Sequence, residues 1–318
     1  MKIGSFCTGI GGLDLAVSAH FDAGHAWHCE YEDAPSRVLE HHWPGVTNHG
    51  DLTATDWTQA EPVDIITAGY PCQPFSHAGL RQGTEDERHL WPAIRDAVRV
   101  LRPRIVVLEN VRGHLTLGFD AVLADLAGLG FDAEWGVFRS SDVGAPHQRA
   151  RLFIVATDAN GEPTGRDTRA ASTTQARREN EPDEPDRDRP ADGHRTTTDT
   201  DSQRARFPKL DSEPDQTQPD TSHRGHVERC GLEDRWGRYA NAVDRWERIT
   251  GHRAPDPVVN GKQLNPLLVE WMMGYAAGWA TSPTIGLSRA QQLKALGNAV
   301  QPQTAELALN VLAARAAA

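Results

Sequence analysis

The sequence predicts a doubly wound α/β protein with a Rossmann-like core. Two short apolar runs, residues 63–68 and 105–108, have the length and composition of strands buried in a parallel sheet. Between them, residues 90–101 carry apolar side chains at helical spacing. The chain also begins with a strand-like segment, a glycine-rich turn and a helical segment, an order typical of this fold class.

The composition narrows the class of protein. With 318 residues and a net charge of −11, the chain can hold one or two domains, and a uniformly basic nucleic-acid coat is disfavoured, although a local basic cleft is not. The cysteines form no CxxC pair, which favours free thiols; they are Cys7, Cys29, Cys72 and Cys230. No apolar run approaches the roughly 20 residues that cross a bilayer. We expect a soluble cytoplasmic monomer with no membrane partner and no metal site.

The first unit is a strand at residues 2–7, a glycine turn at 8–12 and a helix at 13–20. Glycines let the backbone approach a ligand closely, and a helix N-terminus offers free N–H groups. Many α/β proteins use such a turn only to pack a helix on the sheet. From this turn alone, ligand binding and packing are equal alternatives.

A second strand is predicted at residues 26–32, and it ends in acids. In a doubly wound fold an acid at this place hydrogen-bonds the ribose of a nucleoside, and Glu30 is the candidate. A solvated acid is the alternative. Further on, Asp51 could accept a hydrogen bond from an adenine amino group or could cap the turn that follows it.

Cys72 follows the apolar run 63–68 and stands between Pro71 and Pro74. The loop beyond the carboxyl end of such a strand is where ligands bind in open α/β sheets. Two prolines keep this loop stiff and extended, which suits a nucleophile. A buried structural cysteine is the alternative reading of the same residues.

Glu109 ends the next apolar run, so it is expected beside the Cys72 loop. A helix at 121–129 and a strand at 131–137 follow. Arg149 and Arg151 then lie two residues apart in an extended segment that leads into an apolar strand, so they share one side of it. Their charge requires acceptor partners, either in a ligand or in a salt bridge within the fold.

The chain changes character after this strand. Residues 158–228 are rich in charged residues, Thr and Pro and poor in large apolar side chains, which predicts disorder. Order is expected again at a helix up to residue 249, with Val243, Trp246 and Ile249 on one face. Helices at 267–273 and 304–314 follow, the last one packed against the core.

Five motifs, taken in order, resemble those of the DNA (cytosine-5)-methyltransferases. They are FCTGIGG at 6–12, PCQPFS at 71–76, ENV at 109–111, QRAR at 148–151 and GNAV at 297–300. The resemblance covers residues 1–156 and 262–315, leaving the middle unexplained. It departs from the family pattern at His147, where a glutamine is usual, at Lys262, where an arginine is usual, and at Ala299, where serine is commoner.

The resemblance implies a fold with an S-adenosylmethionine-dependent methyltransferase core and a specific chemistry. The thiolate of Cys72 would add to C6 of a flipped-out cytosine in duplex DNA, so that C5 attacks the methyl group of the cofactor. Glu109 would hydrogen-bond N3, Arg151 would face O2, and Arg149 would support them. Nearby arginines would favour a thiolate, because an ordinary cysteine pKa is ~8.5.

The resemblance also implies the S-adenosylmethionine site. Glu30 would bind the ribose, Tyr31 would lie near the adenine, Asp51 would bind its amine, and Asn298 would close the site. The full set is Phe6, Gly9, Gly11, Gly12, Leu13, Glu30, Tyr31, Asp51, Leu52, Pro71, Leu90, Asn298 and Ala299.

Three regions follow from this interpretation. Residues 1–156, completed by 285–318, form the catalytic and cofactor-binding domain; 157–228 are a disordered acidic and polar insert; 229–284 are a small target-recognition region. The helical segment with Trp236, Arg238, Arg245 and Arg248 is the candidate for DNA contact, and an ordinary solvated basic helix is the equal alternative. The function expected is DNA modification in a bacterial restriction–modification system or in phage DNA protection. The alternatives are a tRNA methyltransferase of the same chemistry, a catalytically silent DNA-binding protein and a small-molecule methyltransferase.

Overall fold

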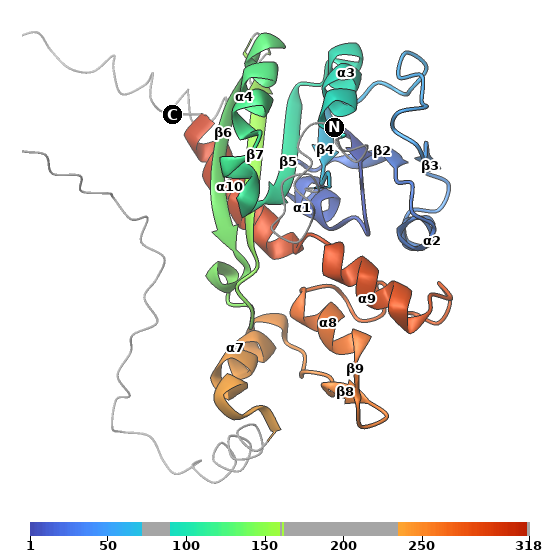
Figure 1. Cartoon of the computed structure of the whole chain (residues 1–318), viewed down its shortest axis with the longest axis vertical. Coiled ribbons are helices and arrows are strands. Elements are labelled where there is room, and N and C mark those ends of the chain that lie inside the picture. Colours follow the sequence, from blue (N-terminus) through green and yellow to red (C-terminus); the bar gives the residue numbers. More distant parts are fainter. Residues whose placement is uncertain (72–89, 160, 162–234, 317–318) are drawn as a thin grey trace, which may run out of the picture. The chain divides into compact units, whose positions relative to one another are not determined.

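The computed structural model describes residues 1–71, 90–159, 161 and 235–316, all of which belong to one compact unit of the chain (Figure 1). Its centre is a seven-stranded sheet in the order β3-β2-β1-β4-β5-β7-β6. The strands are β1 (Lys2–Phe6), β2 (Gly24–Cys29), β3 (Thr47–Asn48), β4 (Ile65–Ala68), β5 (Ile105–Val111), β6 (Phe131–Arg139) and β7 (Ala150–Asp158). Strands β1 to β5 are parallel, whereas β7 runs antiparallel to β5 and β6. The predicted doubly wound α/β fold is confirmed, with one strand reversed.

Helices cover both faces of the sheet (Figure 1). They are α1 (Gly12–Phe21), α2 (Asp33–His42), α3 (Trp91–Leu101), α4 (Phe119–Gly128) and α10 (Pro302–Ala316). On one face, α1 and α10 share an apolar cluster that includes Val17, Leu309 and Leu312. On the other face, α3 and α4 contribute Ile94 and Leu126 to a second cluster. The last helix therefore completes the layer that the first helix begins, as the sequence predicts.

Helix α2 and strand β3 are not predicted from the sequence. Pro35 lies in the first turn of α2, and only Pro35, Val38 and Leu39 of this helix are buried, so its apolar stripe is too short to be recognised. Strand β3 consists of two exposed residues. It is held to β2 because the Asn48 side chain bonds the Glu30 backbone on both sides, at 3.0 Å to the N–H and 3.1 Å to the carbonyl.

The remaining elements follow β7 in the chain. They are η4 (Gly237–Tyr239), α7 (Ala240–Thr250), the hairpin β8 (Val258–Val259) with β9 (Gln263–Leu264), α8 (Pro266–Met272) and α9 (Arg289–Asn298). Trp246 is fully buried among Val243, Leu268 and Trp271. Of the three residues predicted on one face of this helix, Val243 and Trp246 are buried, whereas Ile249 is 53% exposed. It lies on the last turn of α7 and covers the backbone of Gly144 at the surface.

Residues 72–89 and 162–234 lie outside the described part of the chain. Cys72, Cys230 and most of the insert predicted at 157–228 fall there. Of the other cysteines, Cys7 and Cys29 are free thiols. In the described ranges, no helix combines the length and the apolar character that a membrane span requires.

Candidate active site

The parallel strands end at one level. Phe6 pairs with Cys29 of β2 and with Ala68 of β4, and Ala68 pairs with Leu108 of β5. The chain leaves β1 toward β2 and later returns to β4 on the other side, so the strand order reverses at β1, and ligands bind at such a point. A pocket lies there, lined by Cys7, Gly9, Gly69, Glu109, Asn298 and Val300 among others.

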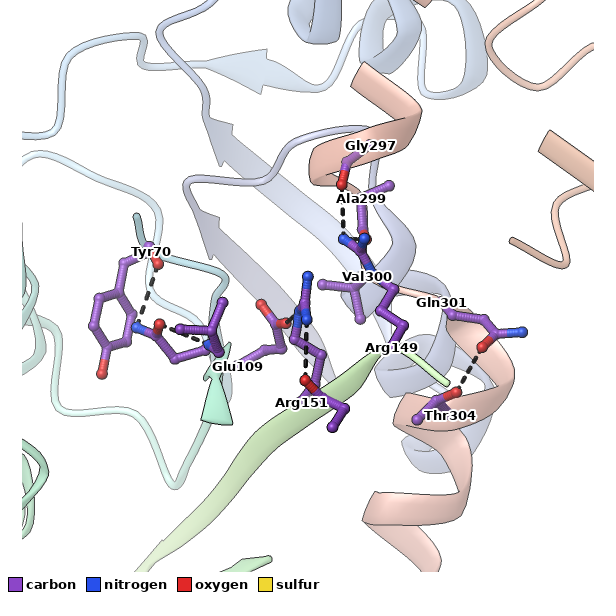
Figure 2. A network of polar contacts seen from close by, with 12 residues as sticks. Tyr70, Glu109, Arg149, Arg151, Gly297, Ala299, Val300, Gln301 and Thr304 are labelled. Atoms are coloured by element: carbon purple, nitrogen blue, oxygen red, sulfur yellow. Dashed lines mark hydrogen bonds and ion pairs between the residues drawn. The ribbon is translucent and has the colours of Figure 1, made fainter. Parts of the chain in front are cut away.

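Glu109 lines this pocket from the end of β5. Its side chain is buried, and Arg151 Nε lies 2.9 Å from its Oε1 (Figure 2). The pairing arises because β7 is antiparallel, so that its first residues return to the end of β5, with Arg151 opposite Val111. Burial raises the pKa of Glu109, while the charges of Arg151 and Arg149 oppose that shift. The acid is therefore held close to a cation in a dry site.

Arg149 shares this side of β7 but has different partners. Its Nη2 donates to the carbonyls of Gly297 and Ala299, at 2.9 and 2.7 Å, on either side of Asn298 (Figure 2). Burial and the neighbouring Arg151 lower the pKa of Arg149 to about 10. Arg151 therefore pairs with Glu109, whereas Arg149 binds the backbone on either side of Asn298.

The glycines of the turn also differ from one another. Gly9 has a φ of +58°, and no described atom lies within 4 Å of the place where a side chain would begin. A Cβ at Gly11 would lie 2.5 Å from the Trp43 ring, and one at Gly12 would lie 2.1 Å from both the Tyr275 hydroxyl and the Val300 carbonyl. The packing alternative is therefore realised at Gly11 and Gly12, whereas Gly9 leaves open space beside the turn.

Glu30 is bound into the turn. One of its carboxylate oxygens accepts the N–H of Gly9 at 2.8 Å, and the other accepts the N–H of Glu32 at 2.8 Å. Burial raises the pKa of Glu30, and these two hydrogen bonds partly oppose the shift. The alternative of a merely solvated acid is excluded, because only 9% of the residue is exposed.

Other predicted cofactor residues have diverse surroundings. Tyr31 is 80% exposed, so its ring is available to a ligand. Asp51 caps the following turn, since its Oδ1 accepts the N–H and the hydroxyl of Thr53 at 2.8 and 2.7 Å, and these bonds lower its pKa. The Phe6 ring is fully buried, with its centroid 5.3 Å from that of Trp27 and 4.9 Å from that of Trp57.

The remaining predicted residues divide between the pocket and the core. Leu13, Asn298 and Ala299 line the pocket. Leu52 is buried in the core cluster that holds the Phe6 ring, and Leu90 packs against the same cluster. Pro71 is exposed, and it is the last described residue before Cys72. The structure thus brings Glu109, Arg151, Glu30 and the Gly9 turn to one edge of the sheet.

Sequence reasoning missed Asp14 and Tyr275. Asp14 lines the pocket from α1, its Oδ1 accepts the Thr67 hydroxyl, and its buried Oδ2 has no hydrogen-bond partner among the described residues. The available signal was an acid on the apolar face of a predicted helix. Tyr275 donates from its hydroxyl to the Val300 carbonyl at 2.7 Å, and no local sequence signal indicates this contact.

The arginines of the predicted DNA-contact helix have partners within the fold. Arg245 Nε donates to the Gly144 carbonyl at 3.1 Å, and Arg248 pairs with Asp244 at 3.1 Å. The Arg238 guanidinium lies over the Tyr239 ring, 5.0 Å from its centroid. Trp236 contacts the Arg235 guanidinium at 5.1 Å. Arg238 and Tyr239 are exposed, so this end of the segment offers most to a partner.

These features define an α/β protein with a pocket at the carboxyl edge of the sheet, where a glycine turn, an acid that follows β2 and a buried carboxylate–guanidinium pair lie together. The family follows from comparison. The profile described as C-5 cytosine-specific DNA methylase matches residues 1–313. Because the match spans nearly the whole chain, the protein belongs to this family, as its motifs indicate.

Curated relatives include type II methyltransferases. The chain is 34% identical over 162 residues to Type II methyltransferase M.NlaX of Neisseria lactamica, covering 48% of this chain and 51% of the relative. It is 32% identical over 154 residues to M.BsuFI of Bacillus subtilis, covering 46% and 37%. A DNA N-6-adenine-methyltransferase of Escherichia phage P1 is 40% identical over 140 residues, covering 40% and 18%. The chain thus matches about half, or less, of the length of these relatives.

Solved structures share the fold over almost the whole chain. The S. pombe Dnmt2 methyltransferase superposes with a TM-score of 0.59 at 13% identity, covering 99% of both chains. The Entamoeba histolytica methyltransferase EhMeth superposes with a TM-score of 0.58 at 14% identity, covering 99% of this chain and 98% of the other. At such identities the likeness shows the fold alone.

Proposed function

We propose that this protein is a DNA (cytosine-5)-methyltransferase that moves a methyl group from S-adenosylmethionine to C5 of a cytosine flipped out of duplex DNA. The observation that carries the proposal is the buried Glu109–Arg151 pair, at 2.9 Å, on the edge of a pocket shared with the glycine turn. The relatives named type II methyltransferases support a role in restriction–modification or phage DNA protection.

The proposed chemistry assigns one role to each group. The Cys72 thiolate adds to C6 of cytosine, which makes C5 nucleophilic toward the methyl group. Glu109 hydrogen-bonds N3 and supplies a proton there as charge develops, while Arg151 fixes the Glu109 carboxyl and faces O2. After C5 has taken the methyl group, a base removes the C5 proton, the Cys72 sulfur leaves C6 as a thiolate, and N3 returns its proton to Glu109. Arg149 acts as a positioning residue, because its bonds go to the Asn298 turn.

The residues present fit S-adenosylmethionine. Gly9 faces open space, Glu30 is fixed beside it, and the exposed Tyr31 ring follows Glu30 directly. The unpartnered Asp14 Oδ2 supplies a buried acceptor in the pocket. Leu13, Asn298 and Ala299 would complete the walls. When bound, the cofactor supplies an electrophilic methyl group.

The packing supports the part of the proposed domain division in which the C-terminal end completes the catalytic domain. The contacts of α10 with α1 join the C-terminal end, residues 285–318, to the catalytic domain 1–156. In the proposed target-recognition region at 229–284, Trp246, Leu268 and Trp271 form a cluster that also includes Ala145, so this region packs against the catalytic domain within one compact unit. Residues 157–228 would be an insert between the two.

Transfer of labelled methyl groups tests this function. The full chain is incubated with labelled S-adenosylmethionine and either duplex DNA or tRNA, and bisulfite sequencing of DNA from cells that express it identifies the methylated base. Label in C5 of cytosine in duplex DNA is the expected result. Label in tRNA alone would establish the alternative substrate, label in free metabolites would indicate a small-molecule enzyme, and no transfer would favour a silent DNA-binding protein.

A further inference from the structure

The segment between α8 and α9 contacts both walls of the pocket. Residues 274–281 follow α8 directly, and two aromatic side chains reach from them into the catalytic core. Trp279 donates its indole N–H to the Ile10 carbonyl at 2.9 Å, and Tyr275 donates its hydroxyl to the Val300 carbonyl at 2.7 Å. These contacts join parts of the chain that are far apart in sequence.

The Trp279 contact falls on the most adaptable part of the glycine turn. Ile10 lies between Gly9 and Gly11, whose φ values are +58° and +81°. Glycines on both sides allow this backbone many conformations. The Gly11 N–H donates to the Thr8 carbonyl at 3.0 Å within the turn, and the Trp279 donor adds a restraint from outside it. The Gly9 N–H is at the same time engaged by Glu30, at 2.8 Å. Two hydrogen bonds from outside the turn therefore fix its shape.

The Tyr275 contact joins the turn to the opposite wall. Its hydroxyl lies so close to Gly12 that a Cβ there would be 2.1 Å away, and Val300 lines the pocket beside Asn298. Tyr275 itself is buried, with 7% of its surface exposed. It thus sets the separation between the start of α1 and the Asn298 segment.

The segment is itself rigidly held. The buried Glu270 carboxylate accepts the N–H groups of Gly278, Ala280 and Thr281 at 2.7, 2.7 and 3.0 Å, and the Thr281 hydroxyl at 2.8 Å. The His42 ring stacks on Trp279, with centroids 3.6 Å apart and planes 7° from parallel. Because the Trp279 indole is fixed in this way, it can restrict the conformation of the more flexible glycine turn.

We infer that residues 274–281 form a positioning clamp, which holds the glycine turn in the conformation that receives the cofactor, with Trp279 as its main contact. This inference rests on the proposed function, since it assumes that the pocket binds S-adenosylmethionine. Trp279 is a positioning residue, because its indole binds the Ile10 carbonyl of the turn and does not line the pocket. Without its N–H, the turn spends only a fraction of its time in the competent shape, and the apparent affinity falls by that fraction.

The test compares Trp279→Phe with the matched variant Trp271→Phe. Trp271 also donates its indole N–H to a backbone carbonyl, that of His252 at 3.1 Å, but it packs in the cluster around Trp246 and not in the cluster that holds Ile10. Binding of S-adenosylhomocysteine to the full chain is measured by calorimetry, and thermal unfolding is recorded for each protein. Loss of one such bond predicts about tenfold weaker binding for Trp279→Phe, with wild-type affinity retained by Trp271→Phe.

A second variant covers the case in which Trp279→Phe fails to fold. Tyr275→Phe keeps the ring and removes only the hydroxyl, and the clamp predicts about fivefold weaker binding. Equal affinity of wild type, Trp279→Phe and Tyr275→Phe would overturn the inference. A loss shared equally by Trp271→Phe would also overturn it, because the effect would then be general destabilisation. If wild type itself binds no S-adenosylhomocysteine, the proposed function fails instead.

Discussion

Two buried carboxylates, Glu109 and Glu270, have opposite surroundings. Glu270 is 1% exposed and receives four hydrogen bonds from residues 278–281. Glu109 is 7% exposed, pairs with Arg151 through Oε1, and lines the pocket. Its Oε2 lies near Gly69, where a Cβ would be only 3.6 Å away.

The different surroundings of Glu270 and Glu109 indicate a structural role for Glu270 and a chemical role for Glu109. A carboxylate offers about four acceptor positions, and the four donors around Glu270 use them within one loop. Glu109 keeps acceptor capacity on the side of the pocket, and burial raises its pKa toward the range of a general acid. Glu270 should therefore matter for stability, and Glu109 for turnover.

The largest expected effect is on catalysis. Glu109→Gln removes the proton donor and the partner of Arg151, so turnover should fall by about 10²–10⁴-fold. Binding of S-adenosylhomocysteine should stay within about twofold of wild type, because Glu30 and the glycine turn are untouched. Methyl transfer to duplex DNA and calorimetry measure the two quantities. Unaltered turnover would remove Glu109 from the mechanism.

The matching change, Glu270→Gln, should act on stability. The amide turns an N–H₂ group toward the Gly278 N–H, so at least one backbone donor loses its acceptor in a buried site, and the free energy of unfolding should drop by about 1–3 kcal/mol. Urea unfolding measures it. An unchanged unfolding midpoint would show that Glu270 does not hold the 278–281 loop.

Arg149→Lys should affect cofactor use more than the chemical step. Lysine cannot reproduce the bonds from one guanidinium to the Gly297 and Ala299 carbonyls. The KM for S-adenosylmethionine should rise about tenfold while kcat changes by less than about threefold. Arg151→Lys is the control, and it should lower kcat instead. The reverse pattern would assign Arg149 to the chemistry.

The smallest effect concerns pH. His28 is 1% exposed, and burial lowers its pKa to about 4, whereas an unfolded histidine titrates near ~6.5. The unfolded state therefore takes up a proton first as the pH falls, so the stability from neutral His28 is complete above pH ~6.5 and is lost toward pH ~4. Between pH ~7.5 and ~5.5 the contribution of His28 to the free energy of unfolding should drop by about 1 kcal/mol, in addition to the contributions of the other histidines whose pKa burial lowers. His28→Gln should flatten this pH dependence, and an unchanged slope would contradict it.

The sequence predicts the fold and the position of Glu109 well, because both depend on local patterns of apolar residues. The apolar run that ends at Glu109 marks β5, and the two-residue spacing of Arg149 and Arg151 places them on one side of β7. The partners of these arginines depend on the antiparallel return of β7 and on the place of the Gly297–Ala299 turn. No local pattern encodes either of these.

Most features that the sequence does not predict depend on contacts between residues that are far apart in the chain. Trp279 and Ile10 are 269 residues apart in the chain, and their hydrogen bond follows only from the packing of the last third of the protein against the first. The packing at Gly11 and Gly12 likewise depends on Trp43, Tyr275 and Val300. A motif identifies such a turn, but it does not say which glycine faces a ligand.

The most direct measurement is covalent trapping. A duplex that contains 5-fluorocytosine at the target sites, identified by bisulfite sequencing, is incubated with the protein and S-adenosylmethionine, because fluorine at C5 prevents the final elimination. The adduct is digested and the modified peptide is identified by mass spectrometry. We predict one adduct, through Cys72, which is absent in Cys72→Ala. Methylation of duplex DNA by wild type without any adduct, or an adduct on another residue, would contradict the account.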